Sequence, residues 1–202
     1  MKKKLLALLL TPFLFVACSS NNDENNNQGQ QGQPNDPPQI ETVKYTVDFG
    51  SVDIKTTDST SSKFNEVMVA NINQNATILE RVEAEGYAQI NDFGDTKALI
   101  VSSNKKDGSL TFNFLKDLVS ITITASPYKK YIDYSDSYSL DEEPVLIVNN
   151  ETWNFETAVE KRDLDKIEKK FDINSSTLTI EGKAGKRVFI HSLEMEFIDE
   201  QD

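Results

Sequence analysis

The chain has 202 residues, of which 33 are acidic and 21 are Lys or Arg, and its formal net charge is −12. This acidic excess argues against binding to nucleic-acid phosphates, which requires clustered Lys and Arg, and against adhesion to an anionic membrane surface through a basic patch. It favours cationic partners or loosely held divalent metal, although a solvated acidic surface is the simpler explanation.

The first 17 residues have the form of a secretory signal. Three lysines at positions 2–4 precede an apolar run over residues 5–16, which only Thr11 and Pro12 interrupt. The run is shorter than the roughly 20 apolar residues that a membrane-spanning helix needs. A basic patch, a short apolar stretch and a small residue before a cleavage point are typical of an exported protein whose signal is removed.

The end of this signal, Phe15-Val16-Ala17-Cys18, resembles the lipobox of bacterial lipoproteins, in which a signal peptidase cuts before a cysteine that carries diacylglycerol. Ala17 and Cys18 match the lipobox, whereas Phe15 stands where leucine is usual. Cys18 is the only cysteine, and lipidation explains a thiol that has no partner for a disulfide. The resemblance implies a protein anchored to membrane lipid through acylated Cys18, on the extracytoplasmic face of the cell membrane. The alternative is an ordinary cleaved signal that happens to contain a cysteine.

Removal of residues 1–17 would change the formal charge from −12 to −15, because three lysines leave with the signal. Residues 19–39 contain almost no apolar side chain and cannot offset the entropy of ordering, so they predict a flexible tether. About 20 such residues have an r.m.s. span of roughly 25 Å. We therefore predict a signal peptide over residues 1–17, a lipidated Cys18 and tether over 18–39, one domain over 40–198 and an acidic tail over 199–202.

Beyond residue 40 the sequence alternates between apolar and polar side chains, which is typical of half-buried strands. The first such run contains Val43, Tyr45, Val47 and Phe49 and ends at Gly50. Short strands at regular spacing, without a regular alternation of strands and helices, predict a mainly-β fold, an antiparallel β-sandwich of jelly-roll type with one or two short helices. Further strands are predicted over residues 97–102, 110–114, 119–125, 145–148, 171–173 and 178–180.

One segment predicts a short amphipathic helix. Phe64, Met68 and Ile72 recur at helical spacing and would share one face. The β-branched Val67 and Val69 at period two fit a strand as well. Residues 164–170 have helical propensity, residues 105–108 (KKDG) predict a hairpin turn, and residues 182–186 (GKAGK) predict another turn.

The last segment, residues 187–197 (RVFIHSLEMEF), changes the parity of its apolar positions. Val188 and Ile190 lie on one face, but Leu193 and Met195 join that face only if one residue is skipped. Such a skip is what a β-bulge produces. We therefore predict a long bulged strand that pairs with the first strand of the domain.

Three of these runs, GSLTFNF (108–114), ITITASPY (121–128) and KRVFIHSLEMEF (186–197), resemble a family of accessory β-sandwich domains in exported bacterial proteins. Such domains often occur in lipoproteins or as tails of secreted nucleases. The resemblance covers about residues 45–197 and implies a jelly-roll architecture similar to that of carbohydrate-binding modules. Because the family has no agreed activity, it implies a fold and no chemistry.

The sequence is poor in groups that carry catalysis. His191 is the only histidine and lies in the middle of a predicted strand, where a structural role is expected. Without a second histidine, and with no thiol except Cys18, zinc sites and nucleophilic pairs are not predicted. Acidic pairs are abundant by chance, so a hydrolase that uses two carboxylates is only a remote alternative. We predict no catalytic residue, no cofactor and no enzyme.

The stretch from residue 133 to residue 143 is strongly acidic. Its carboxylates could bind calcium, which accepts several oxygen ligands. The stretch lacks the spacing and the glycine of an EF-hand loop, and a solvated loop is the simpler interpretation, so no metal site is predicted. The acidic residues are Asp133, Asp136, Asp141, Glu142 and Glu143.

The most suggestive feature outside the predicted core is a cluster of aromatic residues. Exposed aromatic rings present a flat apolar face and a polar edge, which suits stacking on sugar rings or on a protein partner. In the alternative, Tyr128 and Trp153 fill the core and the other residues decorate a loop. The candidate ligand-binding residues are Tyr128, Tyr131, Tyr134, Tyr138 and Trp153.

These observations predict a non-catalytic binding module of the cell envelope, with a cell-surface glycan as its candidate ligand. The alternative is a structural or interaction protein that binds an envelope protein through a sheet edge or a loop face. No nucleic acid partner is expected.

Overall fold

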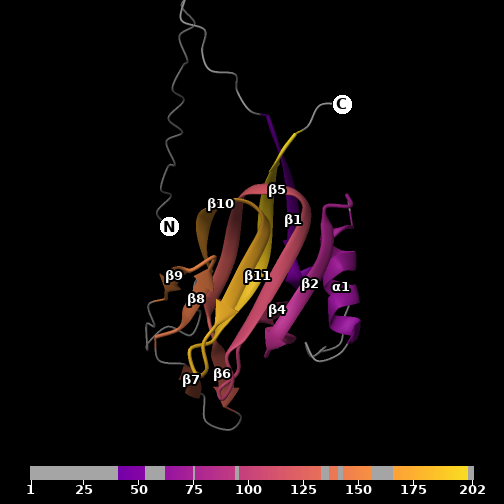
Figure 1. Ribbon diagram of the computed structural model, residues 1–202. Coiled ribbons are helices and arrows are strands. Elements are labelled where there is room, and N and C mark those ends of the chain that lie inside the picture. The colour runs from indigo at the N-terminus through magenta and orange to yellow at the C-terminus, as the bar shows by residue number, and fades with distance from the viewer. Residues whose placement is uncertain are drawn as a thin grey trace, which may run out of the picture. The chain divides into compact units, whose positions relative to one another are not determined.

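The structure, a computed structural model, describes residues 41–52, 62–74, 76–93, 96–132, 137–140, 143–155 and 166–199 (Figure 1). The predicted mainly-β, antiparallel fold is confirmed. Its elements in chain order are β1 (Thr42–Asp48), the 3₁₀-helix η1 (Phe49–Ser51), α1 (Ser62–Ile72), β2 (Leu79–Gly86), β3 (Gln89–Phe93), β4 (Thr96–Ile100), β5 (Gly108–Pro127), β6 (Lys129–Ile132), β7 (Ser137–Leu140), β8 (Val145–Val148), β9 (Glu151–Asn154), β10 (Ile167–Gly182) and β11 (Val188–Ile198).

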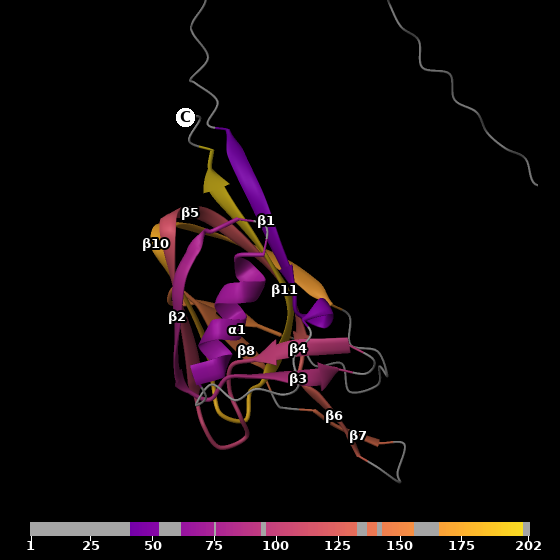
Figure 2. The same cartoon turned by 90° about the vertical axis from the view of Figure 1, so that its right-hand side faces the viewer.

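Nine strands form one antiparallel sheet in the order β3-β4-β11-β5-β10-β8-β9, with β1 paired to β11 and β2 paired to β5. The long strand β5 is central, because β2 pairs with its first half and β11 with its second half, while β10 runs along its other side. Figure 2 shows that the sheet curls around the core as a half-barrel. The predicted division into two sandwiched sheets is not confirmed, since one curled sheet covers the core.

The helix α1 lies in the open side of the curl (Figure 2). Phe64, Met68 and Ile72 are at most 3% exposed and pack in the core, as expected for apolar residues at helical spacing. The prediction of a helix is confirmed, and the alternative of a strand is wrong. After the helix, the Asn73 side chain accepts hydrogen bonds from the backbone amides of Ile78 and Leu79 (3.1 and 2.8 Å), which fixes the path into β2.

The last strand has the predicted bulge. The register between β11 and β5 shifts between Ile190 and Ser192, so His191 is the extra residue. Beyond the bulge, β11 pairs with β1 from Ser192, opposite Asp48, to Ile198, opposite Thr42. The predicted pairing of the last strand with the first is therefore confirmed.

Two local predictions are wrong. Residues 105–108 do not form the turn of a hairpin, because β4 and β5 are not paired with each other. Instead, the Ser103 side chain accepts hydrogen bonds from the amides of Lys105 and Lys106 and closes a turn. Residues 167–170 are not helical, since β10 begins at Ile167 and pairs with β5; the tertiary pairing overrides the helical propensity.

Three glycines lie side by side at one end of the curl. Gly108 of β5 is opposite Gly86 of β2 on one side and Gly182 of β10 on the other. The backbone of Tyr87 and Val101 crosses this row closely, because a Cβ on Gly108 would lie 1.9 and 2.2 Å from their carbonyl oxygens. Only residues without a side chain allow such an approach.

Candidate functional site

The predicted aromatic cluster begins where β5 leaves the nine-stranded sheet. After Pro127 the chain forms β6 and returns as β7, and these two strands make a separate two-stranded sheet. Their register places Tyr131 directly opposite Tyr138. Figure 2 shows the β6–β7 hairpin projecting beyond the nine-stranded sheet. The structure thus brings two of the five candidate residues together as a cross-strand pair.

Two consecutive residues before β11 hold both ends of this hairpin segment. On the outgoing side, the Tyr128 amide donates a hydrogen bond to the Arg187 carbonyl (3.1 Å). On the returning side, the Val145 amide donates to the Lys186 carbonyl (3.0 Å), and the Lys186 ammonium lies 3.0 Å from the Glu143 carboxylate. Lys186 and Arg187 therefore hold both ends of the hairpin segment, and we call this region the clamped base.

The side chain of Tyr128 forms part of this base. The Arg187 guanidinium lies 3.5 Å from the centre of the Tyr128 ring, and the Phe189 ring stacks on Tyr128 with 4.9 Å between centroids. Phe189 also packs with Ala98 and Ile100 of β4 in a small apolar cluster on the outer face of the sheet. Because Arg187 and Phe189 both contact the Tyr128 ring, we interpret Tyr128 as a residue that supports the hairpin and not as one that binds a ligand.

Trp153 lies in the core. It is 7% exposed, and its ring packs against Phe155 and Phe171, with centroid distances of 4.3 and 5.9 Å. This placement agrees with the alternative interpretation of Trp153 as a core residue. Tyr134 and Cys18 lie outside the described residues.

Arg187 and Phe189 were not among the candidate residues. They alternate with Val188 and Ile190, whose burial in the core puts their neighbours on the opposite face of β11. The period-two pattern could have placed Arg187 and Phe189 on that face. It could not have shown that Tyr128 lies opposite them, because this depends on the register between β11 and β5.

His191 is held in the bulge by a buried hydrogen bond. Its Nε2 lies 2.8 Å from Oγ of Ser126, and the two residues are 4% and 0% exposed. Burial, together with the nearby charge of Lys166, lowers the pKa of His191 to about 4, and Asp48 opposes this shift. A hydroxyl and an imidazole at this distance could form a nucleophile and its base. Because the hydroxyl is fully buried, we interpret the pair as structural.

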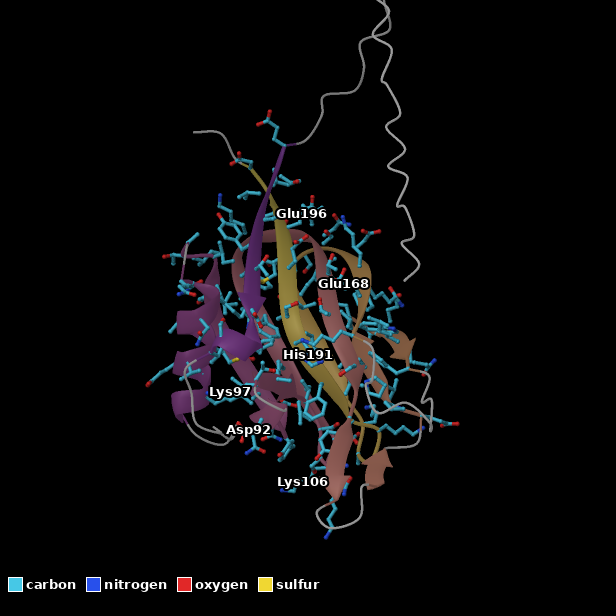
Figure 3. All side chains as sticks on the ribbon, turned by 180° about the vertical axis from the view of Figure 1, so that it is seen from behind. Asp92, Lys97, Lys106, Glu168, His191 and Glu196 are labelled. Atoms are coloured by element: carbon cyan, nitrogen blue, oxygen red, sulfur yellow. The ribbon has the colours of Figure 1, made fainter. Side chains whose placement is uncertain are left out.

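Beyond the bulge, Glu196 joins neighbouring strands on the outer face of the sheet (Figure 3). Its carboxylate accepts hydrogen bonds from Thr42 (2.7 Å), Lys170 (2.9 Å) and Ser120 (2.8 Å), which belong to β1, β10 and β5. These hydrogen bonds, that from Thr42 first, lower the pKa of Glu196 to about 2. The acceptor sites are used within the protein, so the network braces the sheet.

A shallow cleft of about 230 Å³ lies beside the glycine row. The Lys183 ammonium lies 3.4 Å from the Asp107 carboxylate and 3.5 Å from that of Glu181, so these acids are engaged within the protein. The hydrogen bond from the Ala184 amide is the main cause of the lowered pKa of Asp107. The cleft is lined by Glu85, Gly86, Asp107, Gly108, Ser109, Glu181 and Lys183.

Most acidic residues of the segment considered for calcium lie outside the described residues. Of its five acidic residues only Glu143 is described; it is exposed and pairs with Lys186. Across the part of the chain that the structure describes, no three His, Cys, Asp or Glu side chains are grouped so that they could hold a metal ion. The segment left outside contains Asp133, Asp136, Asp141 and Glu142.

Comparisons with models of protein families and with curated proteins give no match to this sequence. Within the described residues, no helix has the length and apolar character needed to cross a bilayer. The functional argument therefore depends on the geometry of the chain itself, and above all on the hairpin.

Proposed function

We propose that this protein is a lipid-anchored, extracytoplasmic binding module without catalytic activity, and that it binds a cell-envelope glycan through the β6–β7 hairpin. The cross-strand pair of Tyr131 and Tyr138 carries the proposal. Residues that oppose each other in an antiparallel pair share one face, with Cβ atoms about 4.5–5.5 Å apart. A tyrosine ring combines an apolar face with a polar edge, and two tyrosines at opposed positions of a hairpin suit the stacking of sugar rings.

The clamped base supports this proposal. A two-stranded hairpin alone is at best marginally stable in water, so a hairpin that recognises a ligand needs support from the domain. Lys186 and Arg187 supply it through the backbone hydrogen bonds to both ends of the segment and through their contacts with Glu143 and Tyr128. Such support reduces the entropy that would be lost when a ligand orders the hairpin.

A second candidate function is binding of an envelope protein by strand addition. In the described part of the chain, β6 and β7 pair only with each other. Their outer edges could therefore accept an extended segment of a partner through backbone hydrogen bonds.

Titration of the mature chain with soluble cell-wall glycans tests the first function. We expect the variant with Tyr131→Ala and Tyr138→Ala to bind at least about tenfold more weakly, a loss of about 1.4 kcal/mol, because both stacking faces are removed. The matched control changes the neighbouring opposed pair, with Lys130→Gln and Ser139→Ala, and keeps both tyrosines. It should bind as the wild type does.

Two results would speak against glycan recognition by the tyrosines. One is wild-type binding that the double tyrosine variant retains. The other is a titration in which no glycan produces heat, while the wild type captures a protein that the Ser139→Pro variant does not capture. This combination would favour strand addition.

Labelling of cells with a palmitate analogue tests the anchor. We expect Cys18→Ala to lose both the lipid label and the membrane fraction, because Cys18 is the only thiol that acyl chains could modify by the lipoprotein route. A variant with Ala17→Gly keeps a small residue before the cysteine and should keep both. Unchanged labelling and retention of Cys18→Ala would show that Cys18 is incidental.

A further inference from the structure

The chain enters the domain at the end of the sheet opposite to the hairpin. Thr42, the first residue of β1, pairs with Ile198, the last residue of β11. The hairpin base is at Arg187, just before β11 begins. At about 3.3 Å per residue, the 11 residues of β11 separate these ends by about 35 Å. Figures 1 and 2 show the start of β1, the end of β11 and the bend of β5 at one end, and β6 and β7 at the other.

Among the side chains that the structure describes, three large apolar ones are exposed, and two of them lie at the end where β1 begins. Leu115 is 56% exposed and lies in the bend of β5, and Ile198 is 41% exposed. The pairing of Phe197 with Leu118 brings the end of β11 to this bend. We call this region, with Leu115 and Ile198, the tether end. Ile167 is 40% exposed and pairs with Ala125, toward the hairpin.

We infer that the tether end rests on the bilayer, with Leu115 and Ile198 in contact with the lipid headgroup region, and that the hairpin is the part of the domain farthest from the membrane. This inference rests on the lipid anchor proposed above. The bilayer is the occupant because only about 20 residues separate Cys18 from the domain, which keeps this end at high effective concentration near the lipid. The contact is apolar, since a chain that has lost residues 1–17 carries a formal charge of −15 and gains nothing from an anionic surface.

Energy transfer on vesicles tests the inference with the full lipidated chain. Because acylation occupies the only natural thiol, one engineered cysteine can carry the donor, either at Asp117→Cys in the bend of β5 or at Ser139→Cys in β7. The vesicles are phosphatidylcholine with an acceptor dye on a fraction of the headgroups. We expect transfer from position 117 to exceed transfer from position 139 at least about twofold, since the two differ by more than 30 Å in height.

The apolar contacts are tested by substitution. Adding Leu115→Ser and Ile198→Ser should reduce the difference in transfer between the two positions, because only the covalent attachment would then hold this end near the lipid. The matched control, Ile167→Ser, removes an apolar side chain of similar exposure near the other end and should preserve the difference.

Flotation of the same vesicles separates this inference from the anchor. Equal transfer from both positions in a chain that floats would overturn the orientation and leave the anchor intact. A chain that does not float would overturn the anchor, and the orientation with it.

Discussion

Replacement of Gly108 with alanine is expected to destabilise the domain by about 3 kcal/mol or more, which is large against a typical total of about 5–15 kcal/mol. The new Cβ would lie 1.9 Å from the carbonyl oxygen of Tyr87 and 2.2 Å from that of Val101. Both atoms are backbone, so no flexible side chain can yield. Relief requires that the crossing segment or the central strand β5 move.

Thermal and urea unfolding measure this effect. For a domain of this size, 3 kcal/mol corresponds to a melting temperature about 6–12 °C lower. Gly185→Ala is the control, because Gly185 has φ +70° but no atom outside its neighbours closer than 3.9 Å to the added Cβ. The Gly185→Ala variant should lower the free energy of unfolding by only about 1 kcal/mol, which is the cost of a left-handed backbone for a residue with a Cβ. If Gly108→Ala melted within 2 °C of the wild type, the close crossing would be wrong.

Lowering the pH from 6.5 to 4 should cost the domain about 3 kcal/mol through His191 alone. The pKa of His191 is about 4 in the folded state and about 6.5 in the unfolded chain. Above pH 6.5 both states hold a neutral imidazole, and its titration has no effect. Between the two values the unfolded state binds a proton that the folded state excludes, so stability falls as the pH falls. Below pH 4 the loss is complete.

Urea unfolding at several pH values separates His191 from the carboxylates. His191→Gln should remove the loss between pH 6.5 and 4. Glu196→Gln should leave it, because Glu196, with a pKa lowered to about 2, contributes stability above pH 4.5 that is lost as the pH falls toward 2. Parallel curves for the wild type and His191→Gln between pH 6.5 and 4 would show that the imidazole is not held in its neutral form.

The local pattern of apolar residues was sufficient for three features of the fold. The alternation around Val47, the helical spacing of Phe64 and Met68, and the change of parity after Ile190 correspond to β1, α1 and the bulge of β11. These features depend on which side of each element faces the core, and the order of residues encodes that side directly.

The arrangement of the strands was not encoded in this way. Periodicity shows that residues 121, 123 and 125 face the core, but not which strand lies beside them, so one curled sheet and two sandwiched sheets have the same pattern. The same limit explains the error at residues 167–170, where pairing with β5 overrides local propensity.

For the candidate site, residue type and order are enough to predict a signal and to identify the lone Cys18 and a tyrosine-rich stretch. Tertiary structure alone decided how the aromatic residues divide. Tyr131 and Tyr138 form a pair outside the main sheet, Tyr128 is held by Arg187 at its base, and Trp153 lies in the core. Each of these outcomes depends on strand register and on contacts between residues far apart in the chain, and a local pattern contains neither.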